Sequence, residues 1–423
     1  MIRSRRRLTG IATTIALLLV VGAVATATPA QQNRIDTVTF LAPELARYGK
    51  YDVGVRTLQV TDNNRVDILN TREGEPPPRY DRTLTVEVWY PAALAAGQKP
   101  GGEYRTLTRD PAISATLYGK GVRGASPIST GGAFPLVVVS HGYPGDRYLM
   151  IHLCENLASK GLVVASIEHK DSTYDDQQTF GSTLYNRPFD QLFVLNEMAR
   201  LGRAGSGSFL SGLVNDRQTG LVGYSMGGYG LINAIGGAFS KASETFPRSP
   251  PNRLLAERGV GNAKADPRIK AAIAIAPWGM QNGFWDAEGL KGIRTPVMFV
   301  SGSADEVSGY ENGTKALFTG AVNTDRYLLT YLYAGHNAGA PIPAPLEAYA
   351  SSPAARSSPF THYADPVWDT TRMNNILVHF ATAWFELYLK GDSGRQAYLD
   401  SSWKGFKPRT AIGLTLEHLP AAR

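Results

Sequence analysis

The chain has 423 residues, a single cysteine and a formal net charge of +7. Its length suffices for one large domain or two small ones. The lone Cys154 excludes an intramolecular disulfide and a metal site built from several cysteines. The positive charge does not indicate nucleic-acid binding, because no basic cluster in the sequence is interleaved with aromatic residues.

Residues 1–30 have the pattern of an export leader. Four arginines precede an apolar core at Ile11–Val24, and the small residues of Ala25–Ala30 offer cleavage sites. Ser4–Leu8 loosely fits a twin-arginine signal. An uncleaved anchor is the alternative, although the core is short for a membrane span. We expect a periplasmic or secreted protein without a stable membrane span. Its net charge falls from +7 to +3 when the four arginines leave, because the leader contains no acidic residue.

Apolar segments that predict strands alternate with segments that predict helices. Leu84–Tyr90 alternates with period two, as an antiparallel strand does, whereas Phe134–Ser140 is continuously apolar, as a buried parallel strand is. Further strands are predicted at Leu162–Ile167, Thr219–Val222, Ile269–Ala276, Pro296–Ser301 and Tyr327–Tyr333, and helices near Met150–Ala158, Pro188–Leu201, Asn312–Phe318 and Thr371–Lys390. The alternation predicts one α/β domain over residues 31–423 with a mostly parallel sheet.

Three stretches interrupt this alternation, near residues 101–132, 239–267 and 337–367. They adjoin the sites predicted at one end of the sheet. Long loops in compact domains are often functional, so these insertions are candidates for lids over a pocket. Insertions that only decorate the surface are the alternative, and the sequence leaves both interpretations open.

The most informative motif is Gly223-Tyr224-Ser225-Met226-Gly227. An apolar strand precedes it and a helix-compatible stretch follows it, which predicts a tight strand-to-helix turn. Small residues on both sides of the serine permit this turn, and the turn presents the serine hydroxyl as a nucleophile. A glycine-rich turn that only packs a helix against the sheet is the alternative.

A serine nucleophile needs a base to remove its proton, and the base needs a carboxylate partner. With this kind of turn the chain order is Ser, then Asp or Glu, then His. Asp305 and His336 each follow a predicted strand, in that order. We therefore predict Ser225 as the nucleophile, His336 as the base and Asp305 as the acid. The neighbouring Glu306 is the alternative acid.

The tetrahedral intermediate of such a reaction needs backbone donors for its oxyanion. The N–H of Met226, directly after the serine, is the first candidate. The loop Ser140–Gly145, which follows a buried strand, is placed to supply the second. Because Pro144 has no N–H, we assign the second donor to Tyr143.

Three segments, Phe134–Asp146, Leu162–Asp171 and Gly223–Gly228, resemble the α/β-hydrolase superfamily. The chain looks most like the bacterial group of predicted dienelactone hydrolases, which is similar to platelet-activating-factor acetylhydrolases and cutinase-like polyester hydrolases. The resemblance covers roughly residues 50–390. It implies the α/β-hydrolase fold, with a mostly parallel eight-stranded sheet, helices on both faces and loop insertions, but it specifies no substrate.

Two departures from these relatives matter. Dienelactone hydrolases use a cysteine nucleophile where this chain has Ser225. Acetylhydrolases of the platelet-activating-factor type carry their acid after the strand that follows the nucleophile helix, and here that strand ends at Pro277-Trp278 without a carboxylate. The acid therefore falls to Asp305, as in cutinase-like enzymes. Trp278 resembles their substrate-wall tryptophan, with a core tryptophan as the alternative.

We therefore expect an exported serine hydrolase that acts on carboxylic esters through an acyl-enzyme, without a metal or organic cofactor. Its substrate would be a small-molecule, lipid or polymer ester, and no nucleic-acid partner is expected. A phospholipid acetyl hydrolase and a lipase or cutinase-like polyester hydrolase stay open as alternatives. A catalytically inactive α/β-hydrolase that serves as a binding module is the alternative from another class.

Overall fold

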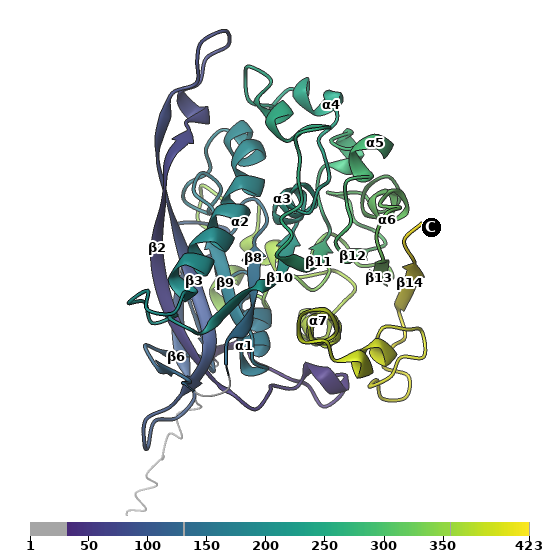
Figure 1. Ribbon diagram of the computed structural model, residues 1–423. Helices are drawn as coiled ribbons and strands as arrows, with labels where there is room; N and C mark the ends of the chain where they lie inside the picture. The colour runs from purple at the N-terminus through teal and green to yellow at the C-terminus, as the bar shows by residue number, and fades with distance from the viewer. Residues whose placement is uncertain (1–31, 130–131, 356, 423) are drawn as a thin grey trace, which may run out of the picture. The chain divides into compact units, whose positions relative to one another are not determined.

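The computed structural model describes residues 32–129, 132–355 and 357–422. Contacts group Asn33–Arg423 into one unit. The predicted leader, residues 1–30, lies outside the described residues. Figure 1 shows a mixed sheet through the middle of this unit, with helices on both of its faces.

Eleven strands form the main sheet of the described residues. Their order is β14-β13-β12-β11-β10-β8-β9-β3-β2-β6, and β7 pairs with β3. The strands are β2 (Asp52–Val66), β3 (Arg79–Ala93), β6 (Val122–Arg123), β7 (Ser126–Pro127), β8 (Phe134–Ser140), β9 (Val163–Glu168), β10 (Val214–Tyr224), β11 (Ile269–Ile275), β12 (Val297–Gly302), β13 (Arg326–Tyr331) and β14 (Leu414–Leu419). The strands from β9 across to β13 pair in parallel. β3 is antiparallel to β2 and β9, and β14 is antiparallel to β13.

The predicted fold class is confirmed, although the sheet has more strands than expected. The eight strands from β13 across to β2 in the sheet order match the number that the resemblance implied, and seven of them were predicted from the sequence; β2 was not. β14 comes from C-terminal residues that had no predicted role, and it pairs with the whole length of β13. The two-residue strands β6 and β7 come from the first predicted insertion; β6 pairs with β2 and extends the other edge, whereas β7 pairs with the end of the interior strand β3.

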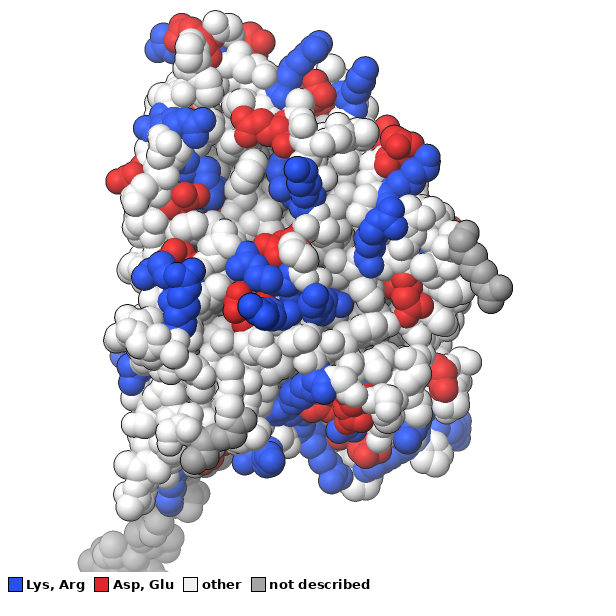
Figure 2. All heavy atoms as spheres, viewed as in Figure 1, with Lys and Arg blue, Asp and Glu red and all other residues white. Residues whose placement is uncertain are grey.

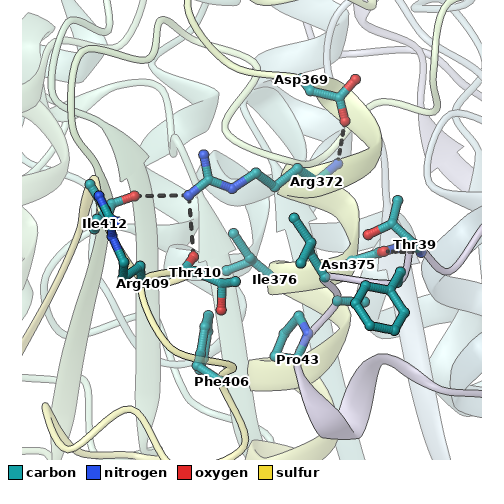
Figure 3. A pocket seen from close by; sticks show the side chains of 13 residues that line it. Thr39, Pro43, Asp369, Arg372, Asn375, Ile376, Phe406, Arg409, Thr410 and Ile412 are labelled. Carbon is teal, nitrogen blue, oxygen red and sulfur yellow. Dashed lines mark hydrogen bonds between the residues drawn. The ribbon is translucent and has the colours of Figure 1, made fainter.

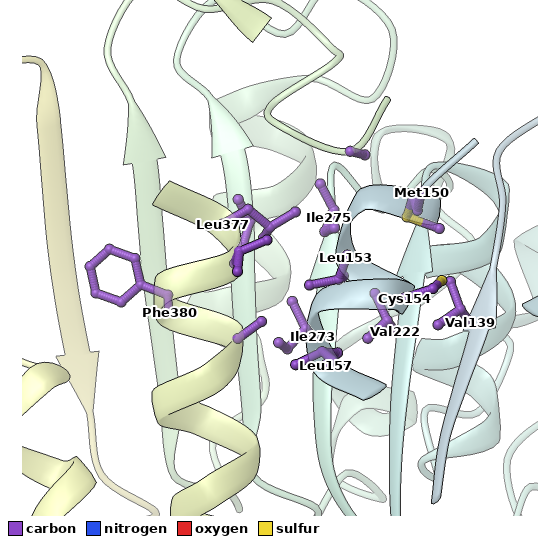
Figure 4. Packing of buried hydrophobic residues seen from close by; sticks show 14 of the residues in the cluster. Val139, Met150, Leu153, Cys154, Leu157, Val222, Ile273, Ile275, Leu377 and Phe380 are labelled. Carbon is purple, nitrogen blue, oxygen red and sulfur yellow. The ribbon is translucent and has the colours of Figure 1, made fainter. Parts of the chain in front are cut away.

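Helices cover both faces of the sheet (Figure 1). α1 (Ile151–Ser159) and α7 (Thr370–Lys390) pack on one face, and α2 (Phe180–Gly202), α3 (Met226–Ala234), α5 (Ala287–Leu290) and α6 (Lys315–Gly320) pack on the other. Side chains alternate along each strand, so Val137 and Val139 of β8 join one core and Leu136 and Val138 join the other. Cys154 of α1 is buried in the first core, among the apolar side chains in Figure 4.

α2 is longer than predicted because it continues through a proline. The sequence placed this helix near Pro188–Leu201, whereas it begins at Phe180. Proline has no N–H, so the carbonyl of Leu184, four residues earlier, loses its partner within the helix. The hydroxyl of Tyr229 in α3 donates to that carbonyl at 3.0 Å. A contact between two helices thus replaces the missing hydrogen bond. No local sequence pattern predicts this contact.

The three predicted insertions contain regular structure. The first forms β4 (Gly102–Leu107) and β5 (Ser114–Gly119), which join β1 (Asn33–Arg34) in a separate three-stranded sheet. The second contains α4 (Lys241–Glu244) and η3 (Leu254–Arg258), and the third contains η6 (Leu346–Tyr349) and η7 (Pro359–His362). The other short helices are η1 (Glu44–Ala46), η2 (Ile68–Asn70), η4 (Met280–Asn282), η5 (Tyr310–Thr314) and η8 (Ser393–Tyr398).

Charged side chains of both signs are spread over the face shown in Figure 2, where lysines and arginines lie among aspartates and glutamates. Among the helices of the described segments, none has the length and apolar character that a membrane crossing requires. The absence of nucleic-acid and membrane partners stays a prediction.

Candidate active site

Ser225 lies at the turn between β10 and α3. Its backbone has φ 52° and ψ −112°, in the region with positive φ that costs a non-glycine residue about 1–3 kcal/mol. The N–H of Ser225 donates to the carbonyl of Ile275 at 2.9 Å, and the carbonyl of Ser225 accepts from the N–H of Trp278 at 3.1 Å. The strained turn is therefore tied to the end of the neighbouring strand β11.

Only glycine fits at two positions beside this turn. A Cβ atom on Gly227 would overlap the carbonyl oxygen of Ser140 in β8, and one on Gly223 would overlap the carbonyl oxygen of Gly227. The close approach of backbone to backbone explains why the motif has small residues on both sides of Ser225.

Ser225, His336 and Asp305 form one hydrogen-bonded chain. The hydroxyl oxygen of Ser225 lies 2.9 Å from Nε2 of His336, and Nδ1 of His336 lies 3.0 Å from Oδ1 of Asp305. The three residues follow β10, β13 and β12, and the carboxyl ends of these parallel strands meet at one edge of the sheet. With its proton held on Nδ1 by the carboxylate, His336 offers Nε2 as an acceptor to the hydroxyl.

The carboxylate of Asp305 is held in its charged form. Burial raises the pKa of Asp305, but the hydrogen bond and charge of His336 and the N–H groups of Val307 and Ser308 outweigh burial, so the pKa lies below its usual value. Those two N–H groups each donate to Oδ1 at 2.9 Å. Asp305 is therefore ionised at neutral pH and is placed to stabilise a proton on His336.

Glu306, the alternative acid, points elsewhere. Its side chain is exposed, and among the described residues it makes no hydrogen bond to His336. The structure thus brings Asp305, and not Glu306, to the imidazole.

The two predicted oxyanion donors adjoin the serine. Gly142 packs so closely that a Cβ atom built on it would lie 3.4 Å from Cβ of Ser225. Tyr143, the next residue, lines the same pocket as Ser225. Met226 begins α3, where the first N–H groups of a helix have no partner within the helix.

Sequence reasoning missed Arg187 of α2, whose guanidinium holds the loop that carries Tyr143. This buried side chain donates to the carbonyl of His141, to that of Gly142 at 2.9 Å and to the hydroxyl of Ser172 at 2.8 Å. In a trans peptide the N–H points opposite to the C=O, so fixing the Gly142 carbonyl also fixes the direction of the Tyr143 N–H. Burial lowers the pKa of Arg187 to about 9. Two of its three partners are loop carbonyls about 45 residues away, and contacts of this kind leave no sequence signal.

A cavity of about 250 Å³ opens beside Ser225. Besides Ser225, His336 and Tyr143, it is lined by Arg109, Tyr224, Glu306, Val307, Asn337, Ser357, Thr361 and His362. Tyr224 donates to Oδ1 of Asn337 at 3.1 Å, which links the turn at the serine to the third insertion. The first and third insertions therefore form walls of this pocket, and their action as lids stays a prediction.

Trp278, the predicted substrate-wall residue, belongs to an aromatic cluster next to this pocket. Its ring is partly exposed and meets the rings of Phe180, Phe246 and Phe284 at centroid distances of 5.2–5.8 Å. Phe180 in turn meets Tyr143 edge to face at 5.2 Å. Trp278 thus combines packing with partial exposure, and its contact with substrate stays a prediction.

A larger cavity, of about 610 Å³, shares no lining residue with the pocket at Ser225. It lies between residues 39–43, α7 and the C-terminal segment (Figure 3). Arg372 in this cavity donates to the carbonyls of Thr410 and Ile412. Its guanidinium is therefore occupied by the protein's own backbone.

A second Ser–His–Asp chain lies directly before the loop at Tyr143. The hydroxyl of Ser140 is 2.8 Å from Nε2 of His169, and Nδ1 of His169 is 3.0 Å from Oδ2 of Asp190. All three residues are at most 1% exposed. Asp190 also forms ion pairs with Arg65 and Arg82.

The described residues hold no group of three or more His, Cys, Asp or Glu side chains placed to bind a metal ion. Of the residues in the chain at Ser225, only His336 and Asp305 are of these types. A reaction without metal or cofactor stays a prediction.

Three comparisons relate the chain to known proteins. The profile of the family described as platelet-activating factor acetylhydrolase, isoform II, matches residues 47–182. A bis(hydroxyethyl) terephthalate hydrolase from Streptomyces coelicolor is 23% identical over 225 residues, which are 53% of this chain and 57% of that hydrolase. The structure of a ferulic acid esterase from Streptomyces cinnamoneus superimposes with a TM-score of 0.59 at 21% identity, over 89% of this chain and 99% of the esterase chain.

The chain is therefore a protein of the α/β-hydrolase fold. Its sequence is similar in part to platelet-activating-factor acetylhydrolases and to the terephthalate hydrolase, in line with the predicted resemblance. The family match ends at residue 182, before Ser225, and the terephthalate hydrolase is matched over little more than half of its length. Neither similarity by itself assigns a substrate.

Proposed function

We propose that the protein is a serine hydrolase of carboxylic esters. The observation that carries the proposal is the hydrogen-bonded chain from Ser225 through His336 to Asp305, of which Ser225 and His336 line a pocket of about 250 Å³. In the first half-reaction the Ser225 oxygen attacks the ester carbonyl carbon while Nε2 of His336 takes the hydroxyl proton. The imidazolium, stabilised by Asp305, then gives this proton to the departing alkoxide, which leaves as an alcohol.

Water completes the reaction in the second half. His336 takes a proton from the water, the hydroxide adds to the acyl carbon, and Ser225 leaves with that proton to release a carboxylic acid. The N–H groups of Tyr143 and Met226 stabilise the oxyanion in both halves, and one such donor contributes about 10²–10³ in turnover. The bonds from Arg187 support this assignment because they fix the peptide that carries the Tyr143 N–H.

A fluorophosphonate probe tests the proposal, because it reacts only with an activated serine. We expect stoichiometric labelling of the wild type, mapped to Ser225 by peptide mass spectrometry, together with hydrolysis of p-nitrophenyl acetate. A folded protein that resists the probe and leaves the ester intact would instead favour the inactive binding module.

Aromatic esters are the substrate class that we propose within this activity. The name of the terephthalate hydrolase relative and the aromatic cluster around Trp278 both support it. A phospholipid acetyl hydrolase is the second candidate, supported by the family match to residues 47–182. Turnover on a panel of aromatic, short aliphatic and glycerophospholipid acetyl esters, with an aromatic polyester film included, separates the two.

We also propose export to the periplasm or medium. The four arginines before the apolar core Ile11–Val24 and the small residues after it support a cleaved leader. Expression of the full chain in a bacterial host, with cell fractionation and N-terminal sequencing, tests this. Retention of residue 1 in the cytoplasmic fraction would reject it.

A further inference from the structure

An arginine from the first insertion and a histidine from the third meet at the rim of the pocket beside Ser225. Nη1 of Arg109 lies 3.3 Å from Nδ1 of His362, and both residues line the pocket. The N–H of Ser352 donates to Asp110 at 2.6 Å and joins the two insertions a second time. The position of the guanidinium is therefore set by contacts between segments about 250 residues apart.

His362 is a neutral partner for this arginine. Burial, together with the neighbouring charges of Arg109 and His336, lowers the pKa of His362 to about 3. Because Arg109 donates to Nδ1, the ring proton lies on Nε2, which faces the hydroxyl oxygen of Tyr174 at 3.0 Å. The imidazole thus orients the guanidinium without neutralising its positive charge.

No carboxylate neutralises Arg109 either. Buried Arg82 has such partners in Asp190 and Asp171. Buried Arg187 has no carboxylate partner among the described residues and is held by carbonyl and hydroxyl oxygens instead. Arg109 is half-buried, and within the described segments no carboxylate oxygen lies within 4 Å of its nitrogens. Four of the five N–H donors of its guanidinium are left for a ligand or for water.

Glu306 is the other charged side chain that lines the pocket with Arg109 and His336. It is exposed and lies beside Gly335, on the wall that carries Asp305 and His336. Water screens an exposed carboxylate effectively, whereas a half-buried guanidinium with a fixed direction is screened less. The wall that carries Arg109 therefore attracts anions, and Glu306 weakens this attraction without cancelling it.

We propose that Arg109 binds a carboxylate at the far end of the acyl group of the substrate, so that the pocket prefers monoesters of dicarboxylic acids to neutral diesters. This inference rests on the proposed ester hydrolysis at Ser225 and names the substrate class of the same site. A planar guanidinium matches a carboxylate with two parallel hydrogen bonds. Arg109 takes no part in bond making or breaking and acts as a specificity-determining residue.

The test compares two esters that differ in one charge, mono(2-hydroxyethyl) terephthalate and its neutral bis ester, in the wild type and in Arg109→Gln. We expect the variant to lose about 10- to 100-fold in kcat/KM for the monoester, mainly through KM, because hydrogen bonds to charged groups are lost. For the neutral diester we expect less than a threefold change. Arg109→Lys keeps the charge but loses the planar guanidinium. Its kcat/KM for the monoester should therefore lie between those of the wild type and Arg109→Gln.

Two matched controls sharpen this comparison. Arg105→Gln makes the same substitution on exposed β4, outside the pocket lining, and should leave both esters unchanged. Glu306→Gln should raise the ratio of kcat/KM for the monoester to kcat/KM for the diester. A third substrate, an acetyl ester of glycerol 3-phosphate, is compared in the wild type and in Arg109→Gln. A loss in Arg109→Gln that is confined to this ester would overturn the acyl-side carboxylate in favour of a phosphate on the alcohol side.

Equal losses on both terephthalate esters, or no loss on either, would overturn the proposal. Its failure is distinguishable from failure of the proposed function, since the latter appears as absent hydrolysis of the neutral diester by the wild type. In that event calorimetric binding of terephthalate itself still tests the subsite. Affinity that is no higher for the wild type than for Arg109→Gln would reject it.

Discussion

The protein contains two Ser–His–Asp chains with the same order of hydrogen bonds, and only one has access to a ligand. In both chains the serine oxygen lies 2.8–2.9 Å from Nε2 of histidine, and Nδ1 lies 3.0 Å from a carboxylate oxygen. The chain at Ser225 borders a pocket, whereas the chain at Ser140 is buried on all sides.

The charges around the two histidines differ as much as their exposure. Burial and the nearby charge of Arg187 lower the pKa of His169 to about 3, although Asp190 opposes this, so His169 is a poor base at neutral pH. Asp190 is held by two arginines, while among the described residues Asp305 has His336 as its only ionisable partner within 4 Å. We therefore expect access and an unshared carboxylate, rather than residue types and their order alone, to distinguish a reactive serine from an unreactive one.

The largest expected difference between the two chains concerns their serines. Ser225→Ala should lower turnover of p-nitrophenyl acetate by about 10⁶, because the nucleophile is lost. Ser140→Ala removes a hydroxyl that no substrate reaches and should change turnover by less than about tenfold. Circular dichroism checks that both variants are folded. Comparable losses of turnover in the two variants would show that the two serines do not differ in their importance for the reaction.

Substitution of the two aspartates should have different effects, on turnover for Asp305 and on stability for Asp190. Asp305→Asn should lower turnover by about 10⁴, because the imidazole loses its orienting carboxylate, with a small effect on stability. Asp190→Asn leaves Arg65 and Arg82 without their shared partner, and breaking a buried ion pair costs about 3–5 kcal/mol in free energy of unfolding. Urea unfolding and steady-state kinetics on both variants measure the two quantities. The opposite pattern would reverse the roles assigned to the two chains.

Arg187 connects the buried region to the pocket. Arg187→Met should lower kcat by about 10²–10³, as loss of one oxyanion donor does, and leave KM nearly unchanged. Affinity for a tetrahedral boronate inhibitor should fall in parallel with kcat, while affinity for the acid product stays the same. Arg200→Met, at an exposed position of the same helix, is the matched control. A parallel loss of product affinity would indicate a general structural defect.

The smallest expected effect concerns stability at low pH. The pKa of Asp305 is lowered in the folded protein, so its stabilising contribution is full above the unfolded-state pKa of about 3.9 and disappears as pH falls through the folded-state value. The difference in free energy of unfolding between the wild type and Asp305→Asn should therefore shrink between pH 6 and pH 3. A difference that grows on acidification would contradict the sign of this shift.

The sequence predicted what local patterns encode. The continuously apolar segments identified β8 to β13, and the motif at Ser225 with the order Asp305 and His336 named side chains that the structure brings together. β14 escaped prediction because Leu414–Leu419 becomes a strand only through its pairing with β13.

The residues that escaped prediction at the site share one cause. Arg187 holds loop carbonyls, and Arg109 meets His362 across about 250 residues. Neither contact has a spacing or composition that a single sequence displays. Long-range polar contacts of this kind, rather than the reacting groups, are what the structure adds.

The backbone at Ser225 bears on the history of this chain. A residue with positive φ and a side chain keeps the native state less stable than glycine would at the same position. A lineage that used this fold only to bind a partner would gain stability from Ser225→Gly and lose nothing. The strain at position 225 is therefore a cost in stability that only a chemical use of the Ser225 hydroxyl would offset.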